Sequence, residues 1–298
     1  MTEKEAKKPV LLTVMAHPDD ESFGMGGTLA YYARRGVDCY LICATRGEAG
    51  LVDEAEMIGF GSIGEKREIE LRCAAGKLGL KKVIFLDYRD SGMLGSIDNE
   101  NENALIRQPN DKVAGEIANH IRQIQPDVVV TFDPIGGYHH PDHIYIHQAT
   151  VQAFDLAGDE SFSSLGDLPA YKPQKLYFQS IPKGMLKFIV AVMRLFGKDP
   201  SKFGRNKDID MAAIARENFP RNAIVDYLKV ALIKDQASAC HHSQLDSSLT
   251  GGIFAPIRRF FASRETFMRA YPAPTEHVEH DLFEGIAELP PLSRTKLY

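Results

Sequence analysis

Apolar runs alternate with amphipathic stretches along the first half of the chain. Four runs have the length and continuity of strands that are buried on both faces of a sheet. They are Val10–Ala16, Val37–Thr45, Lys82–Asp87 and Asp127–Phe132. Apolar positions at helical spacing predict helices between and after these strands. These helices cover Gly26–Arg35, Gly64–Leu78, Asn110–Gln125 and His143–Ala157, and glycine or proline ends three of them, at Gly36, Gly79 and Pro126.

The alternation of strands and helices predicts how the strands pair. Parallel strands joined by right-handed helical crossovers are the usual solution for such a pattern. We therefore expect an α/β fold with a Rossmann-like, doubly wound and mostly parallel sheet. Ligands of such sheets bind outside the carboxyl ends of the strands, so the residues that follow each strand are the first candidates for chemistry.

The second half of the chain is less regular. The pattern predicts a loop over 158–173, a strand over Lys175–Gln179, broken helical material over 183–225, a helix over Lys229–His241 and an extended tail after Pro272. We expect one domain over residues 1–298. In it, residues 10–157 form the α/β core, 158–225 a variable helical cap or insert, and 226–298 the C-terminal part.

Composition and charge narrow the class of protein. The chain has 298 residues, 44% of them hydrophobic and 25% charged, as is ordinary for a soluble globular protein that buries a sizeable core. Its net charge of −5 offers no electrostatic basis for a nucleic-acid partner or an anionic membrane. The most apolar helical stretch, Met185–Phe196, is interrupted by Lys187 and Arg194. It is too short and too charged to span a bilayer, and we expect it to pack against the domain.

The cysteines predict a reducing environment. The four cysteines, at positions 39, 43, 73 and 240, form no C-x-x-C pair, and no apolar leader follows the polar residues 1–9. We therefore expect free thiols in a cytoplasmic protein. The sequence leaves a homo-oligomer open.

Two clusters of chemically active residues follow predicted strands. Residues 16–21 (AHPDDE) place one imidazole and three carboxylates directly after the first strand. Acids this close together repel one another unless a cation compensates. Acidic turns also cap helices, but Asp20 could cap the next helix only if that helix began before Gly26.

The second cluster, residues 138–143 (YHHPDH), follows the fourth strand, after Gly136 and Gly137. A histidine pair at this spacing is often structural. Two His/Asp clusters at strand ends on the same edge of a sheet favour a shared site. Nitrogen and oxygen ligands without cysteine fit zinc or a related divalent metal. Three protein ligands would leave a position open for the water of a catalytic site.

Both clusters match the signatures of a known family. AHPDDE and HPDH, at 16–21 and 140–143, resemble the two motifs of the LmbE/PIG-L family of N-acetylglucosaminyl deacetylases. The resemblance runs from about residue 10 to 155 and resumes near the predicted C-terminal helix. It implies zinc-dependent amide hydrolysis on a small amino-sugar substrate, with ferrous iron as the alternative metal.

The resemblance assigns roles to the motif residues. It implies that His17, Asp20 and His143 bind the metal. Asp19 then acts as the general base, and His140 acts as an acid or stabilises the oxyanion. Asp142 would orient or tune a histidine and so assist catalysis.

Other stretches resemble the branch that contains the mycothiol deacetylase and the mycothiol S-conjugate amidase. They are residues 45–50 (TRGEAG), 88–93 (YRDSGM), 136–138 (GGY) and 241–244 (HHSQ). The resemblance implies substrate-binding roles for four residues. Arg67 would contact the substrate, Asp90 would hold sugar hydroxyls, Tyr138 would lie near the reacting carbonyl, and His241 matches a residue whose role stays open.

Two histidines depart from that branch or offer another ligand set. His139 stands where the branch often has glycine, and a second imidazole beside His140 could compete as a ligand. His147 lies one helical turn after His143, so that these two could instead form a His-x-x-x-His pair.

Three other functions compete with N-deacetylation. An S-conjugate amidase would use the same chemistry on a bulkier acyl group. A Rossmann-like nucleotide-binding protein is suggested by residues 24–29 (GMGGTL), but Leu29 replaces the third glycine and the preceding acidic turn would repel a pyrophosphate. A non-catalytic metal-binding protein would hold zinc without hydrolysing amides. No G-x-S-x-G element supports a serine nucleophile.

Overall fold

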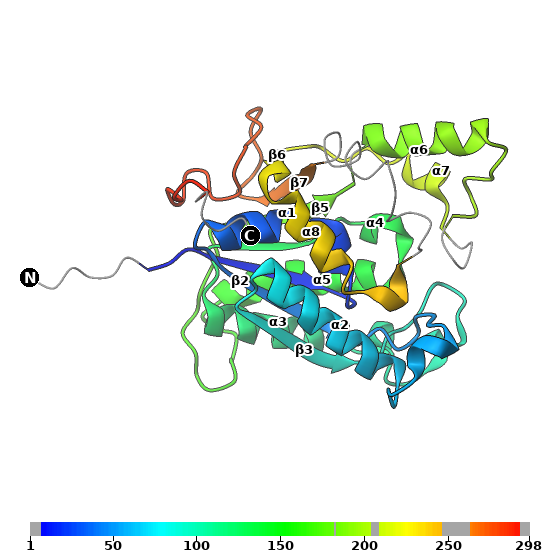
Figure 1. Ribbon diagram of the computed structural model, residues 1–298. Coiled ribbons are helices and arrows are strands. Elements are labelled where there is room, and N and C mark those ends of the chain that lie inside the picture. The colour runs from blue at the N-terminus through cyan, green and yellow to red at the C-terminus, as the bar shows by residue number, and fades with distance from the viewer. Residues whose placement is uncertain (1–6, 182, 204–208, 246–262, 293–298) are drawn as a thin grey trace, which may run out of the picture.

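The computed structural model describes residues 7–181, 183–203, 209–245 and 263–292. Seven strands of these residues form one mixed sheet in the order β3-β2-β1-β4-β5-β7-β6 (Figure 1). Their bounds are β1 Val10–Met15, β2 Asp38–Thr45, β3 Lys82–Tyr88, β4 Val128–Phe132, β5 Lys175–Ser180, β6 Ala223–Asp226 and β7 Arg264–Tyr271. The first five strands pair in parallel, and β7 runs antiparallel to both β5 and β6.

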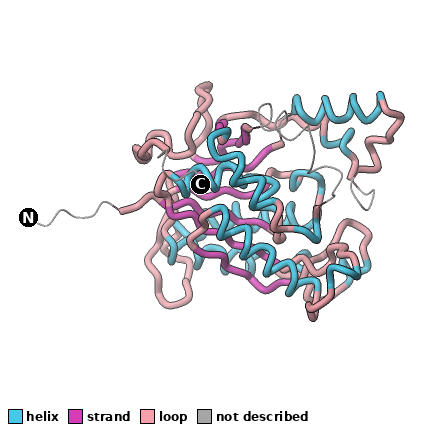
Figure 2. The backbone as a smooth tube through the Cα atoms, in the orientation of Figure 1, coloured by secondary structure: helices cyan, strands magenta, loops and turns pink. Residues whose placement is uncertain are grey.

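Helices cover both faces of the sheet (Figure 2). On one face α1 (Asp20–Arg34), α2 (Ile63–Leu78) and α8 (Ala231–Ser238) pack together, and on the other α3 (Asn110–Ile124) packs on α5 (Pro141–Gly158). Shorter or peripheral helices are α4 Gly136–His139, α6 Lys183–Leu195 and α7 Met211–Ile214. Single 3-10 turns cover Glu54–Met57, Ile97–Glu100, Leu105–Arg107, Leu228–Val230 and His242–Gln244. The predicted doubly wound, mostly parallel α/β fold is confirmed.

Local sequence explains the main elements. Every residue of β1 is buried, as expected for a continuous apolar run in a central strand. Helix α2 begins where the Ser62 hydroxyl accepts a hydrogen bond from the Glu65 backbone, and it ends at Gly79, whose φ of 83° is left-handed. On α3, buried positions three and four residues apart form one apolar stripe.

The strand order places a topological switch point at the centre of the sheet. The chain proceeds outward from β1 through β2 to β3, and then returns to add β4 on the other side of β1. The helices that follow β1 and β4 therefore lie on opposite faces of the sheet, and such switch points are where doubly wound folds bind ligands. The two His/Asp clusters follow these two strands.

The first helix begins earlier than predicted. Helix α1 starts at Asp20 rather than Gly26, with Asp20 and Glu21 in its first turn, where acidic residues favour the helix terminus. Non-helical backbone at Met25 interrupts it, and the Glu265 carboxylate accepts the freed N–H groups of Gly27 and Thr28, at 3.1 and 2.6 Å.

The glycines of residues 24–29 lie inside this helix. A Cβ on Gly27 would lie 2.2 Å from the Tyr227 ring, so the glycine permits close helix packing. The nucleotide-binding interpretation is wrong at this position, because the turn that would hold a pyrophosphate is helical.

Strands β6 and β7 correct the prediction for the second half of the chain. Residues 183–225 were expected to be helical, yet Ala223 begins β6, and β7 was not predicted. Both strands are stabilised by pairing with segments that are distant in the sequence, and local periodicity does not report such pairing. Helices α6 and α7 enclose a small apolar cluster of Leu186, Val190, Met211, Ile214 and Ala215. The opposite face of α6 leaves Phe188 and Leu195 exposed.

The prediction of four free thiols is wrong for two of them. Cys73 on α2 and Cys240 after α8 form a disulfide, with Cα atoms 5.8 Å apart. Cys39 and Cys43 are free and buried. The two bonded positions are 167 residues apart, so only the packing of α8 on α2 brings them together.

Among the described residues, no helix combines the length and the apolar character needed to cross a bilayer.

Candidate metal centre and active site

Three side chains from the two clusters meet at the switch point. His17 follows β1, Asp20 begins α1, and His143 lies in the first turn of α5. His17 Nδ1 lies 3.2 Å from His143 Nε2 and 3.5 Å from Asp20 Oδ2. His143 Nε2 lies 3.2 Å from Asp20 Oδ1. These three residues were the predicted ligand set, and the fold brings them together.

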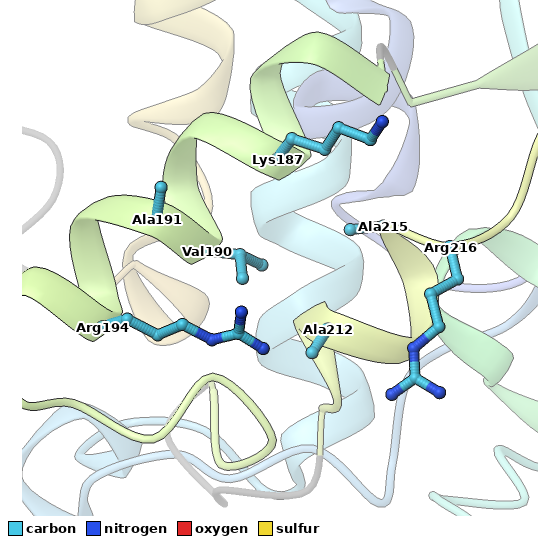
Figure 3. Close-up of a pocket in the computed structure, with 7 residues that line it drawn as sticks. All are labelled: Lys187, Val190, Ala191, Arg194, Ala212, Ala215 and Arg216. Atoms are coloured by element: carbon cyan, nitrogen blue, oxygen red, sulfur yellow. The ribbon is translucent and has the colours of Figure 1, made fainter.

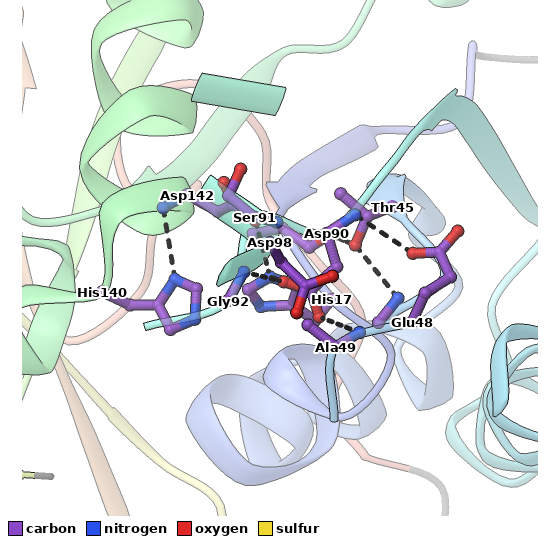
Figure 4. A network of polar contacts seen from close by, with 12 residues as sticks. His17, Thr45, Glu48, Ala49, Asp90, Ser91, Gly92, Asp98, His140 and Asp142 are labelled. Atoms are coloured by element: carbon purple, nitrogen blue, oxygen red, sulfur yellow. Dashed lines mark hydrogen bonds and ion pairs between the residues drawn. The ribbon is translucent and has the colours of Figure 1, made fainter. Parts of the chain in front are cut away.

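Hydrogen bonds at the far side of each ring determine which nitrogen faces this cluster. His17 Nε2 lies 3.1 Å from Asp142 Oδ2 and 3.3 Å from Asp90 Oδ1, so it donates its proton to a carboxylate (Figure 4). His143 Nδ1 lies 3.1 Å from the Gly136 carbonyl oxygen and donates to it. In its neutral form, each ring therefore has a lone pair on the nitrogen that faces Asp20. Without a metal, burial lowers the pKa of His17, but the Asp90 charge and hydrogen bonds to Asp142 and Asp20 raise it well above its usual range overall.

This donor set fits a divalent metal ion. Ligand atoms about 2.1 Å from a tetrahedral zinc ion lie roughly 3.4 Å from one another. The His17 Nδ1–His143 Nε2 separation of 3.2 Å is close to that spacing, and Asp20 approaches the pair with both oxygens, Oδ1 at 3.2 Å from His143 and Oδ2 at 3.5 Å from His17. Among the described residues, His17 also lies within ligand distance of His140 and His143, and of Asp90 and Asp142. Two imidazole lone pairs facing each other and a carboxylate repel unless a cation lies between them. The carboxylates of Asp142 and Asp90 contact the far nitrogen of His17, and the Gly136 carbonyl contacts that of His143. Metal-binding histidines usually make such hydrogen bonds through the nitrogen that does not face the metal.

Asp19 lies beside this cluster in a strained conformation. Its φ of 115° falls in the left-handed region that non-glycine residues rarely adopt. Arg67 Nη2 donates to Asp19 Oδ2 at 3.0 Å and to the Pro18 carbonyl at 2.6 Å. Burial raises the pKa of Asp19 to about 6, although the Arg67 charge opposes that shift.

His140 is a neutral proton donor in this arrangement. Its Nδ1 accepts a hydrogen bond from the Asp142 backbone at 3.2 Å, which caps α5 and leaves the ring proton on Nε2. Burial lowers the pKa of His140 well below its usual range. Its ring centroid lies 4.6 Å from that of His17 and 4.8 Å from that of His143.

Asp142 joins the two clusters. Its side chain is fully buried, and Oδ2 accepts from the Ser91 backbone at 2.9 Å while it lies 3.1 Å from His17 Nε2. The carboxylate therefore orients a histidine from the other motif, rather than its own neighbours.

The four residues expected to bind substrate occupy different environments. Arg67 and Asp90 are each 4% exposed. Arg67 donates to the carbonyls of Gly47 and Pro18, and Asp90 accepts from the backbones of Ala49 and Gly92 (Figure 4). Both side chains are therefore already hydrogen-bonded to other groups of the protein.

Tyr138 and His241 differ from that pair and from each other. Tyr138 is partly buried, with its ring 5.0 Å from His143 and 5.9 Å from His140, and it packs on the apolar cluster of α6 and α7. His241 is fully buried, and its Nε2 lies 2.8 Å from Glu21 Oε1. Although burial acts in the opposite direction, Glu21 raises the pKa of His241.

The two competing histidines lie outside the cluster. His139 is exposed, with a left-handed φ of 66°. His147 Nδ1 donates to the Phe132 carbonyl at 2.9 Å, and its ring lies against Phe178. Neither belongs to a group of possible metal ligands among the described residues.

Sequence reasoning missed several partners of these residues. Glu21 was seen as one of three crowded acids, but its pairing with His241 was not. The motifs contain Glu48 and Ser91, but sequence reasoning assigned neither residue a role. Glu48 accepts a hydrogen bond from the Asp90 backbone at 3.1 Å, and the Ser91 backbone donates to Asp142. Acids and hydroxyls directly after strands were the available signal.

A pocket of about 360 Å³ lies elsewhere, between α6 and α7 (Figure 3). Its lining comprises Lys187, Val190, Ala191, Arg194, Ala212, Ala215 and Arg216. It contains no carboxylate, imidazole or thiol, and thus none of the groups that bind a metal or act as a base in hydrolysis.

Comparisons with known proteins agree with this geometry. A family model described as PIG-L, GlcNAc-PI de-N-acetylase, matches residues 12–154, which contain both clusters. The 1D-myo-inositol 2-acetamido-2-deoxy-alpha-D-glucopyranoside deacetylase 2 of Catenulispora acidiphila is 30% identical, over 96% of this chain and 100% of its own. The corresponding deacetylase of Acidothermus cellulolyticus is 33% identical, over 93% of this chain and 94% of its own.

A solved structure shares the fold. The N,N'-diacetylchitobiose deacetylase of Pyrococcus horikoshii superposes with a TM-score of 0.59 at 22% identity. The match covers 87% of this chain and 83% of that protein.

Proposed function

Because the chain belongs to the PIG-L family, we propose that it hydrolyses the amide of an N-acetylated amino-sugar conjugate, releasing acetate and a free amine. The observation that carries this proposal is the convergence of His17, Asp20 and His143 at the switch point, with Asp19 and His140 beside them. The named relatives, which act on an inositol-linked acetamido sugar, support the substrate class.

His17 Nδ1, Asp20 and His143 Nε2 would hold a divalent metal, with zinc favoured by the mixed nitrogen and oxygen donors and ferrous iron as the alternative. When bound, such an ion acts as a Lewis acid that polarises a carbonyl and lowers the pKa of water. Asp142 and Asp90 keep the His17 ring in the orientation that this requires.

Asp19 is the proposed general base. Its carboxylate is held by Arg67 and adjoins the ligand Asp20 in the chain, so it can accept the proton of the attacking water. His140 is the proposed oxyanion stabiliser, because its Nε2–H is a neutral donor whose other nitrogen is already engaged.

Tyr138 is the best placed of the four expected substrate-binding residues. It is partly exposed beside His140 and His143, whereas Arg67 and Asp90 are buried and occupied by protein partners. We therefore assign Arg67 and Asp90 to positioning of Asp19 and His17, and Tyr138 to contact with the substrate.

The test combines metal analysis with an assay of primary-amine release. Purified protein should contain about one metal ion per chain. It should release amine from N-acetylglucosaminyl conjugates, and bulky thioether-acyl conjugates of the same sugar distinguish an S-conjugate amidase. Asp19→Asn should retain the metal yet lose at least about a hundredfold in kcat, the lower end for loss of an acid–base group.

Asp155→Asn is the matched control. Asp155 lies on α5, about three turns after His143, and its exposed carboxylate pairs with Lys172. It should keep wild-type rates. Metal-loaded protein that hydrolyses no amide would refute the proposal in favour of a non-catalytic metal-binding protein. Wild-type turnover by Asp19→Asn would remove Asp19 from the mechanism.

A further inference from the structure

The backbone at Asp19 needs a restraint. A non-glycine residue with φ 115° and ψ −30° has a strained backbone. It persists only where neighbouring groups hold it. The same residue is the proposed general base, so its strain and its reactive geometry have to be maintained together.

Glu21 supplies one restraint. Its Oε2 accepts the backbone N–H of Asp19 at 3.0 Å. Its Oε1 accepts from the Ser22 hydroxyl at 2.5 Å and lies 2.8 Å from His241 Nε2. Glu21, Ser22 and His241 are all fully buried.

The buried carboxylate depends on these donors. An ionised carboxylate without water is stable only when hydrogen bonds and a compensating charge surround it. Among the described residues, His241 is the only basic side chain that pairs with the Glu21 carboxylate, with Nε2 2.8 Å from Oε1. Removal of the His241 donor would therefore free Glu21 to turn away from the Asp19 N–H.

Neither residue has another evident task. Glu21 and His241 lie outside the groups of possible metal ligands among the described residues. Their full burial keeps both from substrate. A role for His241 in direct sugar binding, suggested by the family resemblance, does not fit this position.

The surrounding structure fixes His241 against the site. Cys240 precedes it and is bonded to Cys73 on α2. Ser243 donates to Glu70 on the same helix, with its backbone at 2.9 Å and its hydroxyl at 2.6 Å. Helix α2 also carries Arg67, which holds the Asp19 carboxylate.

We propose that Glu21 and His241 form a brace that holds the Asp19 backbone in its reactive conformation, so that both are positioning residues for hydrolysis. This inference rests on the proposed function. Arg67 on α2 orients the carboxylate of Asp19, and the brace orients its backbone. Glu21 belongs to α1, and only His241 comes from the segment attached to α2.

Replacement of the His241 donor tests the brace. His241→Phe keeps a ring but has no donor, whereas His241→Gln restores an N–H that can reach Glu21. Because a misplacement of about 1 Å can lower a rate about a hundredfold, His241→Phe should lower kcat by tenfold to a hundredfold. KM and metal content should stay near wild type, and His241→Gln should recover most of the lost kcat.

Hydrogen exchange supplies a readout that is independent of turnover. The amide of Asp19 should exchange faster in His241→Phe than in His241→Gln or the wild type, because its acceptor is released. Ser243→Ala is the matched control, since it loosens the same segment from Glu70 while it leaves the His241 contact to Glu21 in place. It should lower the melting temperature with a much smaller effect on kcat.

Several results would overturn the brace. They are wild-type kcat in His241→Phe, a loss of kcat explained entirely by loss of metal, or no recovery in His241→Gln. If His241→Phe does not fold, His241→Asn, whose amide is too short to reach Glu21, replaces it in the comparison with His241→Gln. If the wild type releases no amine, the proposed function fails, and Asp19 amide exchange still decides whether the brace exists.

Discussion

Two residues near the candidate metal centre have a strained backbone, but for different reasons. Asp19 and His139 have φ values of 115° and 66°, both in the left-handed region. Asp19 is held by Glu21 and Arg67. The His139 side chain is exposed, so its strain has no comparable support. Strain at Asp19 therefore indicates function, whereas at His139 it reflects a turn that glycine would fit.

His139→Gly should stabilise the protein relative to His139→Ala. At ordinary positions glycine destabilises, but at a left-handed φ the alanine Cβ is the strained group. We expect the free energy of unfolding of the glycine variant to exceed that of the alanine variant by about 1 kcal/mol, measured by urea denaturation. The opposite order would show that the loop relaxes out of the left-handed conformation. Metal content should be unchanged in both variants.

Asp142→Asn should weaken metal binding. The variant removes the charge that orients and polarises His17 through Nε2. Loss of such a second-shell partner lowers metal affinity about tenfold to a hundredfold. Competition with a chromogenic chelator measures the dissociation constant, with Asp155→Asn as the exposed-carboxylate control. Unchanged affinity would mean that Asp90 alone orients the ring.

At the scale of elements, α2 links the site to the C-terminal part of the chain. It carries Arg67 toward Asp19, Glu70 toward Ser243 and Cys73 toward Cys240. The chain segment after α8 is thereby attached at two points to a helix of the N-terminal core. The candidate site contains residues from both halves of the chain, although the proposed metal ligands all come from the first half.

The disulfide between Cys73 and Cys240 should be detectable by counting thiols. Denatured, non-reduced protein should present two free thiols, Cys39 and Cys43, and reduction should expose four. The free energy of unfolding of the Cys73→Ser/Cys240→Ser variant should be about 2–4 kcal/mol lower than that of the wild type, because the bond closes a long loop in the unfolded chain. Four thiols before reduction would contradict the bond.

At the scale of the whole molecule, the order of strands creates the site. The proposed ligands His17 and His143 are 126 residues apart, and they meet because β1 and β4 are neighbours in the sheet. Burial of this cluster also couples the stability of the fold to protonation. His241 is an example: burial and the Arg67 charge disfavour its protonated form, while the charges of Glu21 and Asp19 favour it.

The contribution of His241 to stability should decline as pH rises. Burial would lower the pKa of His241, but Glu21 raises it above the unfolded value of about 6.5. A raised folded-state pKa gives stability that is complete below about pH 6.5 and is lost as pH rises through the folded pKa. The unfolding free energy of the wild type minus that of His241→Gln should therefore shrink from pH 6 upward. A constant difference would show that His241 is neutral in the folded protein.

Much of the site followed from local pattern. Apolar runs predicted the parallel core strands, and the acidic and imidazole clusters directly after two of them predicted a metal site at the carboxyl edge. What local pattern could not supply was pairing across long separations. The start of α1 was missed because its glycines look like a loop until Tyr227 and Glu265 pack against them.

The sequence by itself therefore determined the α/β class, the family resemblance and the residues around which chemistry was expected, because these depend on periodicity and short motifs. Only the tertiary structure decided which imidazole nitrogen faces the cluster and that the buried Arg67 and His241 lie around Asp19. It also decided that β6 and β7 complete the sheet and that Cys73 meets Cys240. Each of these depends on contacts between segments far apart in the chain, and such contacts are decided by how the elements pack.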